Sequence, residues 1–339
     1  MKIRKLLGLG LMAGFAASFG LTQVARAAVS MNDPSRDAYY DNFKGKKVVF
    51  VPVFMGLDLT EGWSKMMADQ AKRLGYSYEV RNSNFNTAAG AQTLTSLIGE
   101  KPNVIVVQNP DVSSYAKLEM RAQKAGIHVI QLNMKTNYKT YGFVGADVVL
   151  LGETQARAAV KKCANPAKPG KVLILTGPPS SPFSAYMLKG YQNVLNGNKG
   201  MDVVSVQSTG NYDSSKAQSI TQVVLQQHPD LCAVLGVWDN TDIGTAAAIK
   251  EAGKSKQVFL TTSGGGGALA CKGLHEGLWQ DYVSYDVPGQ GRDLNDLIEA
   301  ALQDKNPVGS TNIMLYTPLK EYTPETLGDH KCWTLKSLQ

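Results

Sequence analysis

Apolar and polar residues alternate along the chain in a pattern that predicts strands and helices in turn. The run VVFVPVF after Lys47 is continuously apolar, as expected for a parallel strand that is covered on both faces. The next segment, residues 62–74, places Trp63, Met67 and Leu74 at helical spacing. Further strand and helix units follow this one, which predicts a parallel sheet with helices on both faces.

The same order of strands and helices occurs twice, before and after the segment 141–160. The first half continues with the strand-like runs YSYEVRN, VIVV and HVIQL, and a helix is predicted at 111–125. The second half carries KVLILTG, DVVSVQ, CAVLGV, VFLTT and DYVSYD, and ends with an amphipathic helix at 289–302. The chain therefore predicts an α/β fold of two similar doubly wound, parallel-sheet lobes.

The predicted lobes are discontinuous in sequence. The segment 141–160 is expected to cross from the first lobe to the second, and the tail after residue 302 is expected to cross between them again. The first lobe is predicted at 45–147 and 287–318, and the second at 148–286 and 319–339.

The crossing segment contains a sharp change from strand to helix at Asp147. An aspartate at a helix N-cap accepts hydrogen bonds from backbone N–H groups that would otherwise be unpaired, and the helix is predicted to begin at Val148. Asp147 is also a candidate ligand contact. A role as a helix cap alone has at least equal weight.

The first 27 residues have the features of a secretory signal peptide. Lys2, Arg4 and Lys5 precede an apolar run at 6–21, and the sequence Ala-Arg-Ala ends at residue 27 as a cleavage site. We expect the mature protein to begin near Ala28 and to be soluble in the periplasm. The apolar run of the signal segment is short for a membrane span.

The charge balance argues against nucleic acid as a partner. Four of the 35 basic residues lie in the signal segment, so 31 remain against 28 acidic residues, a net charge of +3. No basic run with interleaved aromatic residues occurs.

No cofactor and no metal is predicted. The four histidines lack metal-ligand spacing, and neither a G-x-S-x-G elbow nor a Walker loop is present. The glycine run 264–267 could cradle an anion. A turn that lets the backbone approach a ligand or the other lobe is the favoured interpretation.

The cysteines predict disulfides. Their even number, in a chain that a signal peptide directs to an oxidising compartment, favours pairing. Cys163 is predicted near the end of the crossing helix and Cys232 at the start of a strand, so a bond between them is favoured, with Cys271 bonded to Cys332. Four cysteines allow three connectivities, and the sequence does not decide between them.

Candidate ligand-binding residues lie where the predicted strands end, because ligands of open α/β sheets bind beyond the carboxyl ends of the strands. Carboxylates and carboxamides there suit a small, neutral, hydroxyl-rich ligand, and aromatic rings cover its apolar faces. The candidates are Phe54, Asp58, Thr60, Asn109, Asn133, Asp147, Tyr186, Trp238, Asp239, Ser263 and Asp286.

Structural roles compete with binding at several of these positions. Asp58 and Asp239 could be helix caps, and Asn109 could form a turn. Trp63 lies on the apolar stripe of its helix and is expected in the core. Trp238 has no obvious core partner and is the preferred ligand contact.

Several stretches together resemble the periplasmic sugar-binding proteins of ABC importers, of the type that binds ribose or galactose. They are AKRLGYSYEVRNSNFNTAAGAQTLTSLI, VIVVQNP, AQKAGIHVIQL, GADVVLLGETQA, HPDLCAVLGVWDNTDIGTAAAI and DYVSYDVPGQGRDLNDLI, and they extend over essentially the whole mature chain. The resemblance implies two lobes joined by three crossings. It also implies ligand contacts near Asn109, Asn133, Asp147, Asp239 and Asp286.

The chain departs from the family pattern at positions that bear on the ligand. Asn133-Met134 replaces a common Asp-Arg pair, Ala185 or Tyr186 replaces a common Arg, and Thr262-Ser263-Gly264 replaces an aromatic-Asp-Gly sequence. The cleft is thus expected to carry fewer charges and more aromatic rings. This shifts the expectation from ribose or an aldopyranose toward a polyol, a modified sugar or another less polar molecule.

The predicted function is capture of a small sugar or polyol by hinge closure and its delivery to an ABC permease in the inner membrane. The protein is expected to be a monomer and not an enzyme. A receptor for chemotaxis or a sensor kinase is the close alternative. A secreted α/β enzyme and the core of a transcription regulator are weaker ones, because no catalytic constellation and no DNA-binding headpiece is visible.

Overall fold

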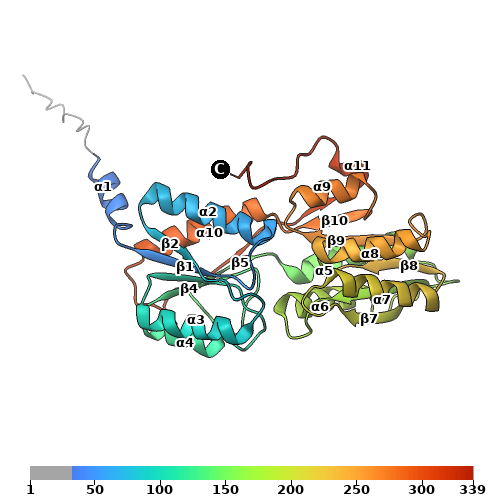
Figure 1. Cartoon of the computed structure of the whole chain (residues 1–339), viewed down its shortest axis with the longest axis horizontal. Coiled ribbons are helices and arrows are strands. Elements are labelled where there is room, and N and C mark those ends of the chain that lie inside the picture. Colours follow the sequence, from blue (N-terminus) through green and yellow to red (C-terminus); the bar gives the residue numbers. More distant parts are fainter. Residues whose placement is uncertain (1–32, 339) are drawn as a thin grey trace, which may run out of the picture.

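The computed structural model describes residues 33–338, and the predicted signal peptide lies outside this part of the chain. Two six-stranded sheets form two lobes side by side (Figure 1). The chain passes from the first sheet to the second after β5, back after β10, and across again between β11 and β12. These three passages agree with the fold class predicted from the sequence.

The first sheet is entirely parallel, with strand order β11-β5-β4-β3-β1-β2. Its strands are β1 (Lys47–Val51), β2 (Ser77–Val80), β3 (Val104–Val107), β4 (His128–Leu132), β5 (Gly142–Gly145) and β11 (Ile313–Tyr316). Helices α2 (Asp58–Leu74) and α10 (Val287–Gln303) pack together on one face, and α3 (Thr87–Glu100) and α4 (Ala116–Lys124) on the other (Figure 1). The short helix α1 (Pro34–Asp41) precedes β1.

The second sheet has strand order β12-β10-β9-β8-β6-β7 and is parallel except for β12, which pairs antiparallel with β10. Its strands are β6 (Gly170–Thr176), β7 (Met201–Ser208), β8 (Leu231–Leu235), β9 (Phe259–Gly264), β10 (Asp281–Ser284) and β12 (Lys320–Tyr322). Its helices are α5 (Val148–Cys163), α6 (Pro182–Leu195), α7 (Ser214–Gln227), α8 (Asp239–Glu251), α9 (Ala268–His275) and α11 (Pro324–Leu327). The exact lobe boundaries stay a prediction.

Two helices begin four or more residues away from the start that the sequence pattern predicted. The helix expected from residue 111 begins at Ala116, because Asp111 Oδ1 accepts hydrogen bonds from the backbone N of Ser113 (2.9 Å) and Ser114 (2.7 Å) and so stabilises a turn. The helix expected from residue 62 begins earlier, at Asp58. Trp63 is fully buried in the core, as its helical spacing predicted.

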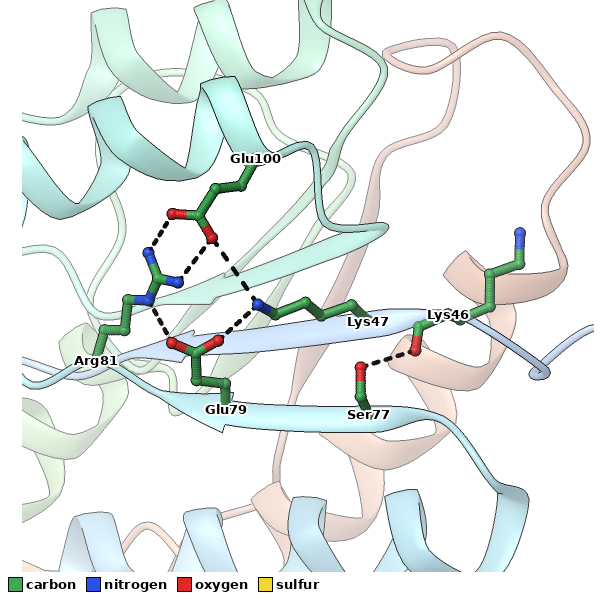
Figure 2. Close-up of polar contacts among 6 residues, drawn as sticks. All are labelled: Lys46, Lys47, Ser77, Glu79, Arg81 and Glu100. Atoms are coloured by element: carbon green, nitrogen blue, oxygen red, sulfur yellow. Dashed lines mark hydrogen bonds and ion pairs between the residues drawn. The ribbon is translucent and has the colours of Figure 1, made fainter.

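Charged side chains join two strands and a helix of the first lobe (Figure 2). The Arg81 guanidinium donates to both carboxylate oxygens of Glu100 at 2.7 Å and to Glu79 at 2.5 Å, and Lys47 Nζ lies 2.6 Å from Glu79. Hydrogen bonds from Arg81 and Lys47 lower the pKa of Glu79 to about 2. The group therefore ties β1, the end of β2 and the end of α3 together.

The segments that connect the lobes are linked by an ion pair. Asp286 precedes α10 and has a left-handed backbone, with φ of 53°, and its carboxylate lies 2.7 Å from Lys320 Nζ. Thr317 Oγ1, on the segment between β11 and β12, donates to Asp293 Oδ2 of α10 at 2.6 Å. Two of the three passages are thus held against each other at the hinge.

Both disulfides of the structure lie in the second lobe. Cys163 at the end of α5 is bonded to Cys232 of β8, with 6.0 Å between the Cα atoms, and Cys271 of α9 is bonded to Cys332 of the tail, with 5.8 Å. The second bond holds the tail against α9. Among residues 33–338, no helix is both long and apolar enough to cross a membrane.

Candidate functional site

A central cavity lies between the lobes, beyond the carboxyl ends of both sets of strands. Its volume is about 40 Å³, measured as the space open to the centre of a water molecule. Nine of its eleven lining residues are apolar or aromatic, two are carboxamides, and none is charged. The first lobe contributes Val53, Phe54, Leu59, Phe85, Gln108, Asn133 and Met134, and the second Phe183, Tyr212, Trp238 and Tyr285.

Aromatic rings from the two lobes meet across this cavity. The Phe54 ring lies 5.7 Å from the Trp238 ring, between centroids, and Tyr212 meets Trp238 edge to face at 6.1 Å. In the second lobe, Phe183 and Tyr285 also meet edge to face, at 5.8 Å. Such walls favour a ligand that presents a flat or ring-shaped apolar face.

Phe54 is held in place by a second ring from its own lobe. Phe85 stacks on it with 4.8 Å between centroids and 12° between planes. Both Asn84 and Phe85 have left-handed backbones, with φ of 51° and 56°, and Phe85 N donates to Val53 O at 2.6 Å. A left-handed phenylalanine is costly, so the strained turn indicates that ring position matters here.

Trp238 is held by a buried carboxylate behind it. Its backbone N donates to Asp242 Oδ2 at 3.2 Å, and this oxygen also accepts from Thr262 Oγ1 at 2.5 Å. Thr245 Oγ1 donates to the other oxygen at 3.0 Å. Asp242 is fully buried, and burial raises its pKa to about 7.

Two carboxamides supply the unpaired polar atoms of the central cavity. Gln108 Oε1 accepts from Val53 N at 3.2 Å, which leaves the buried Nε2 without a partner among residues 33–338. Asn133 Oδ1 is likewise buried and unpaired within the described chain. Because buried polar groups are almost always hydrogen-bonded, both amides are suited to bind polar atoms of a ligand.

Two of the cavities that adjoin the central one are lined by further residues predicted from the sequence. A cavity of about 220 Å³ shares Leu59 and Trp238 with it and is also lined by Asp58 and Asp239. A cavity of about 230 Å³ shares Asn133 and Phe183 with it, and Asp147 and Tyr186 lie on its wall. Seven of the eleven residues predicted from the sequence thus line these three cavities: Phe54, Asp58, Asn133, Asp147, Tyr186, Trp238 and Asp239.

The other four predicted residues line none of these three cavities. Each makes contacts that hold nearby backbone or the hinge: Thr60 Oγ1 donates to Leu57 O (3.4 Å), Asn109 Nδ2 to Met134 O (3.2 Å), Ser263 Oγ to Val237 O (2.9 Å), and Asp286 pairs with Lys320. Their role as ligand contacts stays a prediction, and the cavity geometry lends it no support.

Asp239 reaches the cleft wall, but its oxygens are occupied within the second lobe. Tyr282 OH donates to Oδ2 at 2.7 Å, and Asn240 donates to Oδ1 from its backbone N at 2.8 Å and from Nδ2 at 3.0 Å. Burial is the main reason that its pKa rises to about 6, and the charge of Asp58 adds to this. Asp147 caps α5 as predicted, with Oδ1 accepting from Leu150 N at 3.0 Å.

The glycine run at 264–267 lies against the first lobe and the tail. Trp333 Nε1 donates to Gly265 O at 2.7 Å, and a side chain at Gly265 would lie 2.6 Å from Val287 Cγ2. These contacts support the interpretation of a close backbone approach. No group of three or more metal-ligating side chains occurs in residues 33–338.

The sequence analysis did not select several residues that line the central cavity. Phe85 lies on the loop between β2 and α3, and Tyr212 on the loop between β7 and α7. An aromatic residue in a loop that follows a strand is the sequence feature that could have identified them as cavity residues. Gln108 and Tyr285 directly precede the selected residues Asn109 and Asp286, and Phe183 lies in the first turn of α6, ahead of the selected Tyr186. Val53, Leu59 and Met134 carry no polar group that would have marked them.

The family of the chain follows from a sequence comparison over most of its length. Residues 48–306 match the model of the periplasmic binding protein domain. The chain belongs to this family. The family consists of binding proteins rather than enzymes.

Individual members of the periplasmic binding protein family are distant relatives. The ribose import binding protein of Escherichia coli is 26% identical over 196 residues, which is 58% of this chain and 64% of that protein. The matched region thus spans less than two thirds of the relative's length.

Solved structures show the same fold. A galactofuranose binding protein superposes with a TM-score of 0.74 at 18% identity, over 86% of this chain and 98% of that one. The Caulobacter myo-inositol binding protein superposes with a TM-score of 0.73 at 20% identity, over 83% and 95%. At such identities the likeness concerns the fold alone.

Proposed function

We propose that this protein captures a small sugar or polyol between its lobes and delivers it, in the periplasm, to the permease of an ABC importer. One observation carries the proposal. Both lobes contribute aromatic rings to one central cavity, in which Gln108 Nε2 and Asn133 Oδ1 have no hydrogen-bond partner among the described residues. A ring compound with polar substituents fits both features.

The aromatic rings and the amides of the cavity make different kinds of contact with a ligand. Aromatic faces cover the C–H faces of a sugar or polyol ring, and amide groups exchange hydrogen bonds with its hydroxyls. Ligand contacts with both lobes at once favour the closed arrangement, because a ligand shifts the equilibrium only through contacts that differ between the closed and the open state. No catalytic group is needed, and we infer that the ligand leaves unchanged.

Membership in the periplasmic binding protein family supports the proposal. The names of relatives include a ribose import binding protein, and those of similar structures a myo-inositol binding protein. The ligand class, the permease and the periplasmic location are carried over to this chain as parts of the proposal.

Thermal-shift screening of the mature protein against sugars and polyols, followed by calorimetry, tests the proposal. Gln108→Glu keeps the oxygen that accepts from Val53 N but removes the unpaired donor, so it should raise the Kd of a neutral ligand about tenfold. Val203→Ala, at an exposed residue of β7, is the control and should bind as wild type does. The proposal fails if no compound shifts the Tm, or if Gln108→Glu binds the ligand unchanged.

A further inference from the structure

Lys135 lies in the cleft within a cage of aromatic rings. Its Nζ is 5.0 Å from the centroid of the Phe143 ring, 5.2 Å from that of Tyr316 and 5.8 Å from that of Tyr186, and it donates to Tyr316 OH at 2.8 Å. Tyr186 belongs to α6 of the second lobe, and the other two rings to the first. The ammonium group therefore lies where the lobes meet.

This ammonium group has no carboxylate partner in the described chain. No acidic oxygen of residues 33–338 lies within 4.0 Å of Lys135 Nζ. Aromatic rings position a cation without neutralising its charge. Of residues 33–338, Lys135 is also the only basic one that lines the central cavity or the adjoining cavity of about 230 Å³.

A second positive feature lines the same adjoining cavity. Helix α6 begins there, with Pro182 and Phe183 on the cavity wall. Its N-cap residue, Ser181, makes no capping hydrogen bond, because its Oγ lies 2.9 Å from Tyr212 OH instead. Pro182 has no N–H, so the first turn of this 14-residue helix leaves the N–H groups of Phe183 and Ser184 without a cap, and such groups attract negative charge.

Asn133 connects this cavity with the central one. It lines both and is 6% exposed, and its buried Oδ1 has no hydrogen-bond partner among the described residues, so this oxygen can accept a hydrogen bond from a ligand hydroxyl. Its backbone is left-handed, with φ of 59°, and the backbone N donates to Val144 O at 2.7 Å. The buried amide is thus held between the ring-lined cavity and the Lys135 cage.

One acidic residue, Asp147, also lines the adjoining cavity. Its Oδ1 accepts from Leu150 N, so its charge stabilises the start of α5. The residue is exposed, and it forms no ion pair with Lys135. Lys135 is half-buried, and the Tyr186 and Tyr316 rings beside it are exposed, so its attraction for an anion is also screened until a ligand between the lobes displaces water.

We propose that the natural ligand is a hydroxylated ring that bears a carboxylate: a sugar acid or a cyclic polyol acid. Its ring lies between the aromatic walls of the central cavity, where a ring hydroxyl donates to Asn133 Oδ1, and its carboxylate lies at Lys135, near the N-terminus of α6. A charge-assisted hydrogen bond from an ammonium group is about twice as strong as a neutral one, so Lys135 selects acids over neutral counterparts. This inference rests on the proposed function and departs from the neutral ligand expected from the sequence.

Matched pairs of probes test the inference by calorimetry at low ionic strength. The acids are D-galacturonate and quinate, and their neutral counterparts are D-galactose and the methyl ester of quinate. Wild type should bind at least one acid about tenfold or more tightly than its counterpart. Lys135→Met should lose that preference, and Lys135→Arg should retain it because the charge is kept.

Lys139→Met is the matched control, since Lys139 is an exposed lysine on the same connection between β4 and β5. It should leave every Kd unchanged. A Lys135→Met protein that keeps the acid preference overturns the inference, and so does a wild type that prefers neutral probes. Binding of neutral probes alone leaves the proposed function intact. Failure of all four probes overturns the inference, and the wider screen for any sugar or polyol ligand then decides the proposed function separately.

Discussion

Asp242 should make the stability of this protein depend on pH in a way that one substitution removes. Its carboxylate is fully buried behind Trp238 and accepts three hydrogen bonds, from Trp238 N, Thr262 Oγ1 and Thr245 Oγ1. Burial raises its pKa from the ordinary value of 3.8 to about 7. The folded protein therefore holds this proton more tightly than the unfolded chain does.

The sign of the effect follows from that difference. Because the pKa of Asp242 is higher in the folded protein than in the unfolded chain, its protonation adds to the unfolding free energy. This contribution has its full size below pH 3.8 and declines as the pH rises toward 7, where Asp242 ionises in the folded protein as well. Each pKa unit corresponds to about 1.4 kcal/mol, so the three-unit shift is worth up to about 4 kcal/mol of unfolding free energy. Between about pH 5 and pH 8, roughly 3 kcal/mol of this should be lost.

Asp242→Asn removes the titration and keeps the shape of the side chain. Urea unfolding measures the unfolding free energy of wild type and variant at pH 5 and at pH 8. The difference between the two proteins is then compared between the two pH values, and the contributions of the other buried acids cancel because both proteins contain them. The advantage of wild type over the variant should shrink by roughly 3 kcal/mol on going to pH 8. Asp202→Asn, at an exposed residue of β7, is the control, and its unfolding free energy should change with pH as that of wild type does. The reasoning is refuted if the unfolding free energy of Asp242→Asn also changes with pH as that of wild type does.

Four other outcomes follow from the structure. Trp238→Ala should raise the ligand Kd about tenfold in calorimetry while the fold persists, since its ring covers the cavity. Gly152→Val should lower the unfolding free energy by more than about 3 kcal/mol in urea, because a Cβ there would lie 2.3 Å from Met187 O. Replacing Cys163 and Cys232 by Ala opens a loop that spans a sequence separation of 69, and should cost about 4 kcal/mol by the same assay. Arg81→Leu should cost about 1 kcal/mol at pH 7 and less as the pH falls toward 2, where Glu79 loses its charge.

The alternation of apolar runs and amphipathic segments was enough to predict the fold class. Continuous apolar runs such as VIVV became β3, buried on both faces, and the repeated pattern became two similar sheets. The sequence predicted helix ends less well. Asp111 shows the reason, since its side chain competes with the helix for backbone N–H groups, and spacing alone does not reveal that competition.

The candidate site was predictable only to the level of which strand ends take part. Side chains of one type at neighbouring positions have different uses: Asn133 faces the cavity, whereas Asn109 Nδ2 donates to Met134 O. Ser263 and Asp239 satisfy groups inside the second lobe. Which polar atoms stay unpaired depends on the packing of distant strands, and a local sequence pattern carries no information on that.

The division between rings and polar atoms also indicates where selectivity arises. Rings such as Phe54 and Trp238 contact each other directly across the cleft, so they favour the closed arrangement whichever ring compound lies beside them. The unpaired amides of Gln108 and Asn133 act differently, because a ligand that fails to bond them leaves buried polar atoms unsatisfied on closure. Discrimination between similar ring compounds should therefore depend on these amides and on Lys135. The aromatic rings of the protein should contribute about equally to the affinity for each of these compounds.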